Sequence, residues 1–273
     1  MRSCPIGEGA PPRSYEQDAR GHVTGRRTDY ERMAAVYDAG RALSLDQLDA
    51  WRVVLSRYVP APGRPVLDLG SGTGLFSEAL TTWFDVVVLG VEPSDAMRRE
   101  AATKRPLPDV IYVGGRAERI PLRDRCCDCA WLSTVLHHIA DLRACAGELR
   151  RVLKDGDPVL IRNSFGDRIE HVHWLDFFPP AKRLAAKRWP TVEQTAEAFS
   201  STGFGVETLE SVPEVIAPDL RAYHDRLRVR ANSTLTLIDE DEFAEGLARL
   251  DRAASEQTSP ELVVDRRDLL VLR

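Results

Sequence analysis

The chain is poor in lysine and cysteine and has no long apolar run. It holds 273 residues, with 37 Lys or Arg against 42 Asp or Glu and a net charge of −5. This balance lacks the basic excess that is typical of nucleic-acid-binding domains. No stretch approaches the roughly 20 apolar residues of a membrane helix, and the polar, proline-containing N-terminus has no apolar signal segment. We therefore expect neither a nucleic acid nor a membrane as partner; the sequence does not indicate an oligomeric state.

The few cysteines argue against a disulfide framework. There are five, an odd number, and three of them crowd together as Cys126, Cys127 and Cys129. We expect reduced thiols and a cytoplasmic location. Zinc would need four ligands, usually in paired spacing. Because this cluster enters an apolar run, core packing of small thiols is the favoured interpretation over a metal site.

Short apolar runs alternate with helical stretches along most of the chain. Runs of this length, separated by helices, indicate a buried, mostly parallel sheet. The pattern predicts an α/β fold with a doubly wound, Rossmann-like sheet of seven strands. The expected strands are 65–70, 86–92, 110–114, 127–133, 158–163, 206–211 and 268–273, and the expected helices among them are 75–84, 95–104, 142–154 and 191–204.

The remaining residues surround this core. Residues 1–27 mix Gly, Pro, Arg and Ser without periodicity, which predicts a flexible arm. Capping-box spacing at Thr28 and again at Ser44 predicts a helical cap over residues 28–60 that ends at Pro60. The main domain is expected to span 61–273, with insertions at about 164–190 and 218–262.

A glycine-rich turn follows the first expected strand. Residues 66–74 read VLDLGSGTG, so a strand runs into Gly70, Ser71, Gly72 and Gly74 and then into a helix. Glycines let the backbone turn sharply and approach a ligand closely. Glu92 ends the next expected strand, twenty residues after Gly72, where an acid hydrogen-bonds ribose hydroxyls in dinucleotide-type sites.

Two features separate this turn from a nicotinamide site. Its spacing is G-x-G-x-G rather than G-x-G-x-x-G, and Asp68 would repel a pyrophosphate but attract a cationic amino group. A ligand with a ribose and an α-ammonium group but no phosphate meets both conditions, and S-adenosylmethionine is such a ligand. A nicotinamide oxidoreductase is the weaker alternative, since no Tyr-x-x-x-Lys pair is present.

The middle of the chain resembles a known family. The segments VLDLGSGTG (66–74), VEPSDAM (91–97), GRAERIPL (115–122) and CDCAWLSTVLHHIAD (127–141) are similar to those of class I S-adenosylmethionine-dependent methyltransferases, of the small-molecule type related to the ubiquinone and menaquinone methyltransferases. The Arg- and Ala-rich composition with this architecture also resembles enzymes of natural-product biosynthesis. The resemblance implies S-adenosylmethionine as cofactor, S-adenosylhomocysteine as product and methyltransferase activity.

The resemblance also implies roles for individual residues in holding the cofactor. Many relatives have Asp where Arg116 stands here, so the contact to the adenine amino group stays unassigned. The implied cofactor residues are Asp68, Gly70, Ser71 and Gly72 for the methionine part and ribose, Glu92 for the ribose hydroxyls, Pro93, Met97, Ala117 and Glu118 around the adenine, Ser133 near the methyl group, and Tyr37 and Arg41 from the cap.

The absence of two sequence motifs limits the kinds of molecule that could accept the methyl group. No Asn/Asp-Pro-Pro-aromatic motif follows the fourth strand, and the strand ends lack the acid pair that holds magnesium in catechol-type enzymes. We therefore expect metal-independent, in-line methyl transfer to a small molecule. Phenol and indole types are the favoured acceptors, and carbon, oxygen and nitrogen all stay open as the methylated atom.

Several side chains are candidates for contacting that acceptor. His138 and Tyr37 are candidate bases. The imidazole of a histidine such as His138 titrates near neutrality, which suits proton removal. A structural role for the His137–His138 pair is the alternative. His173 lies in a His-x-His pattern that is better explained by a polar lid contact than by a metal. We predict that these side chains and the two insertions form an acceptor pocket with apolar, aromatic walls. Its expected residues are His137, His138, His173, Trp174, Phe177 and Tyr223.

Two other functions stay open. The fold can serve an S-adenosylmethionine-binding enzyme that does not methylate, such as a cyclase, and the nicotinamide oxidoreductase is less favoured still. The number of methyl groups gained by the product separates the first alternative from methyl transfer.

Overall fold

The computed structural model describes residues 48–273, which contain a seven-stranded sheet. The strand order is β3-β2-β1-β4-β5-β7-β6, with β7 antiparallel to both neighbours and the other pairings parallel. The predicted doubly wound, Rossmann-like fold class is confirmed. The strands are β1 (Pro65–Leu69), β2 (Val87–Glu92), β3 (Val110–Gly114), β4 (Cys129–Ser133), β5 (Val159–Asn163), β6 (Val206–Ala217) and β7 (Val263–Leu272).

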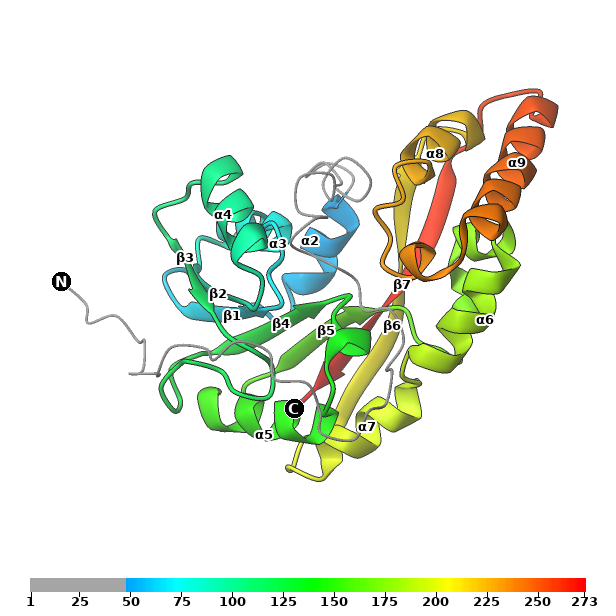
Figure 1. Cartoon of the computed structure of the whole chain (residues 1–273). Helices are drawn as coiled ribbons and strands as arrows, with labels where there is room; N and C mark the ends of the chain where they lie inside the picture. The colour runs from blue at the N-terminus through cyan, green and yellow to red at the C-terminus, as the bar shows by residue number, and fades with distance from the viewer. Residues whose placement is uncertain (1–47) are drawn as a thin grey trace.

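Helices cover both faces of the sheet (Figure 1). One face carries α2 (Asp49–Leu55), α3 (Leu75–Phe84) and α4 (Asp95–Lys104), and the other carries α5 (Leu142–Val152) and α7 (Val192–Ser200). Side chains along a strand point alternately to the two faces. Val66 accordingly packs in the core under α2 and α3, whereas Leu67 packs in the second core under α5 and α7.

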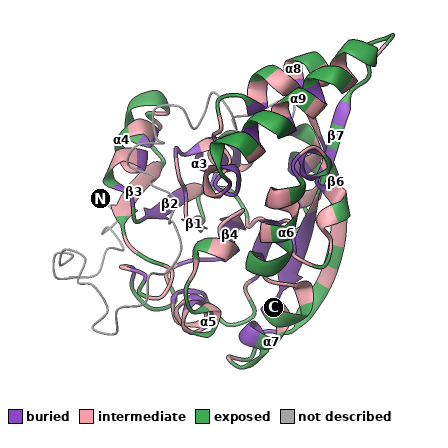
Figure 2. Ribbon diagram, turned by 45° about the vertical axis from the view of Figure 1, so that its right-hand side comes forward, coloured by how far each residue is buried: buried purple, intermediate pink, exposed green. Residues whose placement is uncertain are grey.

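The two predicted insertions pack against β6 and β7. The first contains the 3₁₀ turns η2 (Ile169–His171) and η3 (His173–Asp176) and the helix α6 (Pro179–Arg188). The second contains α8 (Leu220–Leu227), η4 (Leu235–Leu237) and α9 (Glu240–Glu256). In Figures 1 and 2, α8 and α9 lie side by side along the outer ends of β6 and β7.

Several elements differ in length from their prediction. β6 continues to Ala217 and β7 begins at Val263, because the two strands keep pairing until Ala217 lies opposite Val263. The helix expected to reach Pro60 ends at Leu55 instead, as the amide groups of Arg57 and Tyr58 bond three residues back rather than four. The rest of the predicted cap, including both capping boxes, lies outside the described residues.

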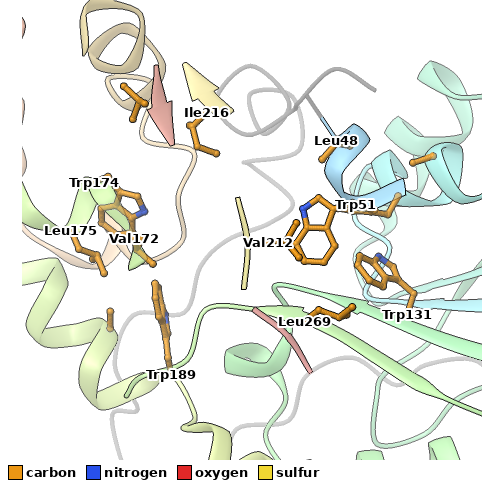
Figure 3. Packing of buried hydrophobic residues seen from close by; sticks show 14 of the residues in the cluster. Leu48, Trp51, Trp131, Val172, Trp174, Leu175, Trp189, Val212, Ile216 and Leu269 are labelled. Atoms are coloured by element: carbon orange, nitrogen blue, oxygen red, sulfur yellow. The ribbon is translucent and has the colours of Figure 1, made fainter. Parts of the chain in front are cut away.

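Tryptophans from distant parts of the chain fill the core beneath the insertions (Figure 3). Trp51 of α2 meets Trp131 of β4 edge-to-face, with ring centroids 5.9 Å apart. Trp174 and Trp189 both belong to the first insertion and lie on the opposite side of Val212 from Trp51 in Figure 3. The aromatic residues of this insertion therefore pack it onto the sheet and also line the space above β5.

The clustered cysteines are core residues. Cys127 and Cys129 are fully buried, and burial raises the pKa of the Cys129 thiol well above its usual range. Cys126 is half-buried, and the thiols of Cys126, Cys127, Cys129 and Cys145 are free. The core-packing interpretation is therefore confirmed for Cys127 and Cys129.

Candidate active site

The glycine turn, residues 70–74, connects β1 to α3 in a left-handed conformation. Gly70, Gly72 and Gly74 have φ values of 76°, 53° and 82°, which side chains rarely adopt. A Cβ on Gly70 would stand 2.5 Å from Val135 Cγ1, and the amide of Gly70 donates to the carbonyl of Val91 at 2.7 Å. Within residues 48–273, a Cβ on Gly72 would meet no atom within 4 Å, so this part of the chain leaves the backbone of Gly72 open to a ligand.

Glu92 lies beside the glycine turn at the end of β2. Its Oε2 accepts from the amide of Gly72 at 3.1 Å and its Oε1 from the amide of Ser94 at 2.9 Å. The residue is 8% exposed. A carboxylate at the end of this strand is the group that hydrogen-bonds ribose hydroxyls in dinucleotide-type sites. This geometry agrees with the role that the sequence predicts for Glu92.

Asp68 is buried at the base of the same turn. Its Oδ2 accepts from the hydroxyl of Ser77 at 2.6 Å, and the side chain is 1% exposed. Burial raises its pKa from 3.8 to about 7, the Ser77 hydrogen bond opposes this shift, and the nearby Glu92 charge adds to it. A buried carboxylate of this kind gains stability from a cationic ligand, as the predicted contact with an α-ammonium group requires.

We expect Asp68→Asn to stabilise the folded chain in a pH-dependent way. The folded pKa of about 7 lies above the ordinary 3.8, so folding takes up a proton between these values. The free energy of unfolding that this group contributes falls as the pH rises from about 4 to 7, by roughly 4 kcal/mol at most. Urea denaturation should therefore show the variant more stable than the parent above pH 7, with the difference vanishing below about pH 4.

The exposed Asp109, just before β3, supplies the matched control. Asp109→Asn also removes one carboxylate but opens no buried site, so its free energy of unfolding should stay near that of the parent. An Asp68→Asn variant that is less stable than the parent above pH 7 would contradict the burial cost assigned to this carboxylate.

The residues around the glycine turn fit a nucleoside that carries an ammonium group. Ser71 Oγ is buried and has no hydrogen-bond partner within residues 48–273, so it has a donor and acceptor available for a ligand. Of the predicted adenine neighbours, Pro93 is exposed and Met97 is 2% exposed beneath the first turn of α4. Glu118 accepts from the amide of Ala140 at 2.9 Å. Ala117 is partly buried in the loop before Glu118, and Tyr37 and Arg41 lie outside the described residues.

Ser133, at the end of β4, is tied to a buried ion pair that the sequence does not reveal. Arg162 of β5 donates to Ser133 Oγ at 3.0 Å and to Glu214 Oε1 at 2.7 Å through Nε. Trp51 also donates to Glu214 Oε1, at 2.6 Å. Glu214 is 1% exposed. The network joins α2, β4, β5 and β6 and holds the Ser133 hydroxyl in place.

A cleft above β4 and β5 adjoins this network. It consists of two hollows that are partly open to solvent and share Trp174, Asn232 and Arg267. Their empty volumes, with this open solvent included, are about 340 and 530 Å³. Thr134, which follows Ser133 directly and has the uncommon φ of 54°, lines the first hollow. The first hollow is further lined by His137, Asn163, Ser164, Trp189, Ser233 and Thr234, and the second by Arg162, Glu214, Ile216, Tyr223, Arg226, Leu227, Ala231 and Asp265.

The structure brings only some of the predicted acceptor residues to this cleft. His137, Trp174 and Tyr223 line it, and His137 Nε2 lies 3.3 Å from Ser233 Oγ. His138, the predicted base, is exposed and is absent from both linings, although its ring lies 3.9 Å from that of His137. His173 and Phe177 pack against each other in the first insertion and do not line the cleft.

The predicted apolar walls are wrong for the second hollow. Three arginines and two carboxylates line it, because β5, β6 and β7 each turn a charged side chain toward the same space. Burial raises the pKa of Tyr223 well above its usual value, so this phenol stays protonated. Arg162 and Asn163 end an apolar strand in the sequence, which is a signal that a polar site begins there. Glu214, Asp265 and Arg267 carry no such local signal.

The fold and the glycine turn define a class of protein. Ligands of open α/β sheets bind at the carboxyl ends of the strands, where the strand order reverses, and here β1 and β4 flank that point. A G-x-G-x-G turn with an acid at the end of β2, next to a cleft over β4 and β5, defines a Rossmann-like, S-adenosylmethionine-dependent domain. The cofactor is S-adenosylmethionine.

Comparison with known proteins agrees with this class. The model of a methyltransferase domain family matches residues 67–161. An uncharacterized methyltransferase of Bacillus pumilus is 30% identical over 163 residues, which cover 56% of this chain and 75% of the relative. The chain therefore belongs to the methyltransferase family. A demethylmenaquinone methyltransferase of Renibacterium salmoninarum is 29% identical over 135 residues, covering 48% of this chain and 55% of the relative.

Solved structures share the fold at low sequence identity. A protein of Anabaena variabilis, provisionally assigned as a methyltransferase of an antibiotic biosynthesis pathway, has a TM-score of 0.66 at 20% identity, covering 82% of this chain and 96% of that one. The [4+2]-cyclase SpnF has a TM-score of 0.59 at 18% identity, covering 92% and 98%.

The match to most curated relatives is partial. The chain spans about half the length of the malonyl-[acyl-carrier protein] O-methyltransferase of Nitrosospira multiformis, with 48% covered at 29% identity. Within residues 48–273, no helix has both the length and the apolar character needed to cross a membrane.

Proposed function

We propose that this chain transfers a methyl group from S-adenosylmethionine to a small acceptor with an aromatic part, bound in the cleft above β4 and β5. The observation that carries the proposal is the position of this cleft. Its lining starts at Thr134, directly after Ser133, and Arg162 connects the lining to the Ser133 hydroxyl. The predicted cofactor site and the cleft thus meet at the end of β4.

The side chains of the chain itself divide into two sets. Glu92, Ser71 and Asp68 hold the nucleoside and its ammonium group, and the bound cofactor supplies an electrophilic methyl on a sulfonium. His137, Trp174 and Trp189 face the acceptor, with the His137 and Trp189 rings 6.0 Å apart. Flat aromatic walls favour a ring in the acceptor. His137, whose Nε2 lies 3.3 Å from Ser233 Oγ, is better placed than His138 to accept a proton from the acceptor.

Two considerations bear on the acceptor and the reaction. The relatives are named for malonyl-[acyl-carrier protein] and for demethylmenaquinone, which are chemically different acceptors. The aromatic acceptor is therefore proposed from the cleft itself. The fold is also shared with the [4+2]-cyclase SpnF, so the decisive measurement is whether the product gains a methyl group.

We expect Trp174→Ala to lower kcat/KM at least tenfold while S-adenosylhomocysteine binding persists. Trp174 lines both hollows, and losing a flat contact with the acceptor costs more than about 1.4 kcal/mol of transition-state binding. The test incubates the chain with S-adenosylmethionine and a panel of phenols and indoles, and measures methylated product by mass spectrometry. Trp83→Ala on α3, away from the cleft, is the control and should leave kcat/KM unchanged. Products without an added methyl group would favour the cyclase-like alternative.

A further inference from the structure

Arg267 of β7 occupies the junction of the two hollows. It lines both of them, together with Trp174 and Asn232. Its Nη1 donates to Ser164 Oγ at 3.1 Å and its Nη2 to Asp265 Oδ2 at 2.9 Å. Its Nε is buried without a hydrogen-bond acceptor within the described part of the chain, and Glu214 Oε2 lies 4.0 Å from it. A buried guanidinium N–H that makes no hydrogen bond lowers the stability of the fold unless a ligand accepts a hydrogen bond from it.

The first hollow suits an anion. Among the residues that the structure places in its lining, Arg267 is the only arginine, and there is no lysine and no carboxylate. The other polar groups there are the imidazole of His137, the indole N–H groups of Trp174 and Trp189, and hydroxyls and amides. All of these can donate to an anion, and the hydroxyls and amides belong to Thr134, Ser164, Ser233, Thr234, Asn163 and Asn232. A negatively charged group in this hollow therefore meets one cation and several neutral donors.

The second hollow limits how much charge that anion can carry. Asp265 is held by two donors, the Arg267 guanidinium and the amide of His173 at 2.8 Å. Glu214 pairs with Arg162 at 2.5 Å and Asp265 pairs with Arg267 at 2.9 Å, so two of the three arginines in this lining already face a carboxylate, and a singly charged group matches the site better than a dianion such as a phosphate monoester. A carboxylate carries a single charge and has two oxygens that match the planar guanidinium.

We propose that the acceptor carries a carboxylate group, which Arg267 binds at the junction of the two hollows while the aromatic part lies against Trp174. This proposal rests on the proposed methyltransferase function, because it specifies the acceptor of the same site. It defines the acceptor as an aromatic carboxylate rather than a neutral ring compound.

The test compares matched probes on the chain saturated with S-adenosylhomocysteine. Indole-3-acetate, its neutral isostere indole-3-acetamide and phenyl phosphate are titrated by calorimetry. We expect the carboxylate to bind at least about tenfold more tightly than the amide, as a charge-assisted hydrogen bond provides, and more tightly than the phosphate. Equal binding of carboxylate and amide, binding of neither up to the solubility limit, or tighter binding of the phosphate would overturn the proposal.

Variants of Arg267 test whether this residue causes the preference for the carboxylate over the amide. In Arg267→Gln the carboxylate should lose its advantage over the amide, whereas Arg267→Lys should keep part of it. Because Arg267→Gln leaves Asp265 buried beside a neutral partner, the double variant Arg267→Gln/Asp265→Asn removes both charges and should show the same loss. Arg266→Gln is the matched control, since Arg266 is the exposed neighbour on the same strand, and it should keep the full preference. A preference for the carboxylate that persists in Arg267→Gln and in the double variant would exclude Arg267 as its source.

The two proposals fail in different ways. If S-adenosylhomocysteine does not bind, the proposed function is wrong. If it binds and the carboxylate shows no advantage, only the carboxylate proposal is wrong.

Discussion

Glu92→Ala is expected to weaken S-adenosylhomocysteine binding at least about a hundredfold, because two hydrogen bonds from ribose hydroxyls to a charged carboxylate are lost together. The carboxylate stands beside the glycine turn and accepts from the Gly72 amide, so the substitution also removes a hydrogen bond that holds this turn. Calorimetric titration of the purified chain measures the dissociation constant directly.

A control on the neighbouring helix separates loss of the site from general loss of charge. Glu100→Ala on α4 removes an acid that pairs with Lys104 at 2.9 Å on the helix surface. It should bind S-adenosylhomocysteine like the parent chain. Unchanged affinity in Glu92→Ala, with a folded near-ultraviolet spectrum, would show that the nucleoside lies elsewhere.

Glu214→Ala is expected to lower the free energy of unfolding by about 3–5 kcal/mol, because it leaves the Arg162 guanidinium buried without its counter-charge. Arg162 is 8% exposed, and Trp51 loses its hydrogen-bond acceptor in the same variant. Arg162, which donates to the Ser133 hydroxyl, is then no longer held by Glu214, so affinity for S-adenosylhomocysteine should fall as well. Urea denaturation and the thermal midpoint measure the stability change.

Glu210→Ala, on the same strand, is the matched control. Glu210 pairs with Arg57 at 2.6 Å, but the two side chains are 30% and 51% exposed. An exposed ion pair contributes at most about 1 kcal/mol, so this variant should unfold almost like the parent. Equal losses in Glu210→Ala and Glu214→Ala would contradict the buried role of Glu214.

The local part of the site could be predicted from sequence because its residues lie in one β-turn-α-β segment. Gly70, Gly72 and Asp68 are adjacent in the chain, and Glu92 ends the strand that pairs with β1 in parallel. Parallel neighbouring strands bring their carboxyl ends to the same edge of the sheet, so residues at these strand ends are predicted to lie close together. The contacts of these residues with the cofactor stay predictions.

The acceptor side could not be predicted in the same way, since its contacts join residues far apart in the chain. Glu214 lies 52 residues from Arg162 and 163 from Trp51. The segment VVDRRDLLVL does not reveal whether Arg266 or Arg267 faces inward, because a shift of one residue in register exchanges the two faces of a strand.

Composition, periodicity and the glycine turn thus determined the fold class and the cofactor. Both depend on short-range patterns that any chain with this spacing shares. The tertiary structure alone decided that the cleft is charged, that His137 rather than His138 lines it, and that Arg267 stands at its centre. These features depend on the pairing of β5, β7 and β6 and on the insertions packed above them, so no single segment contains them.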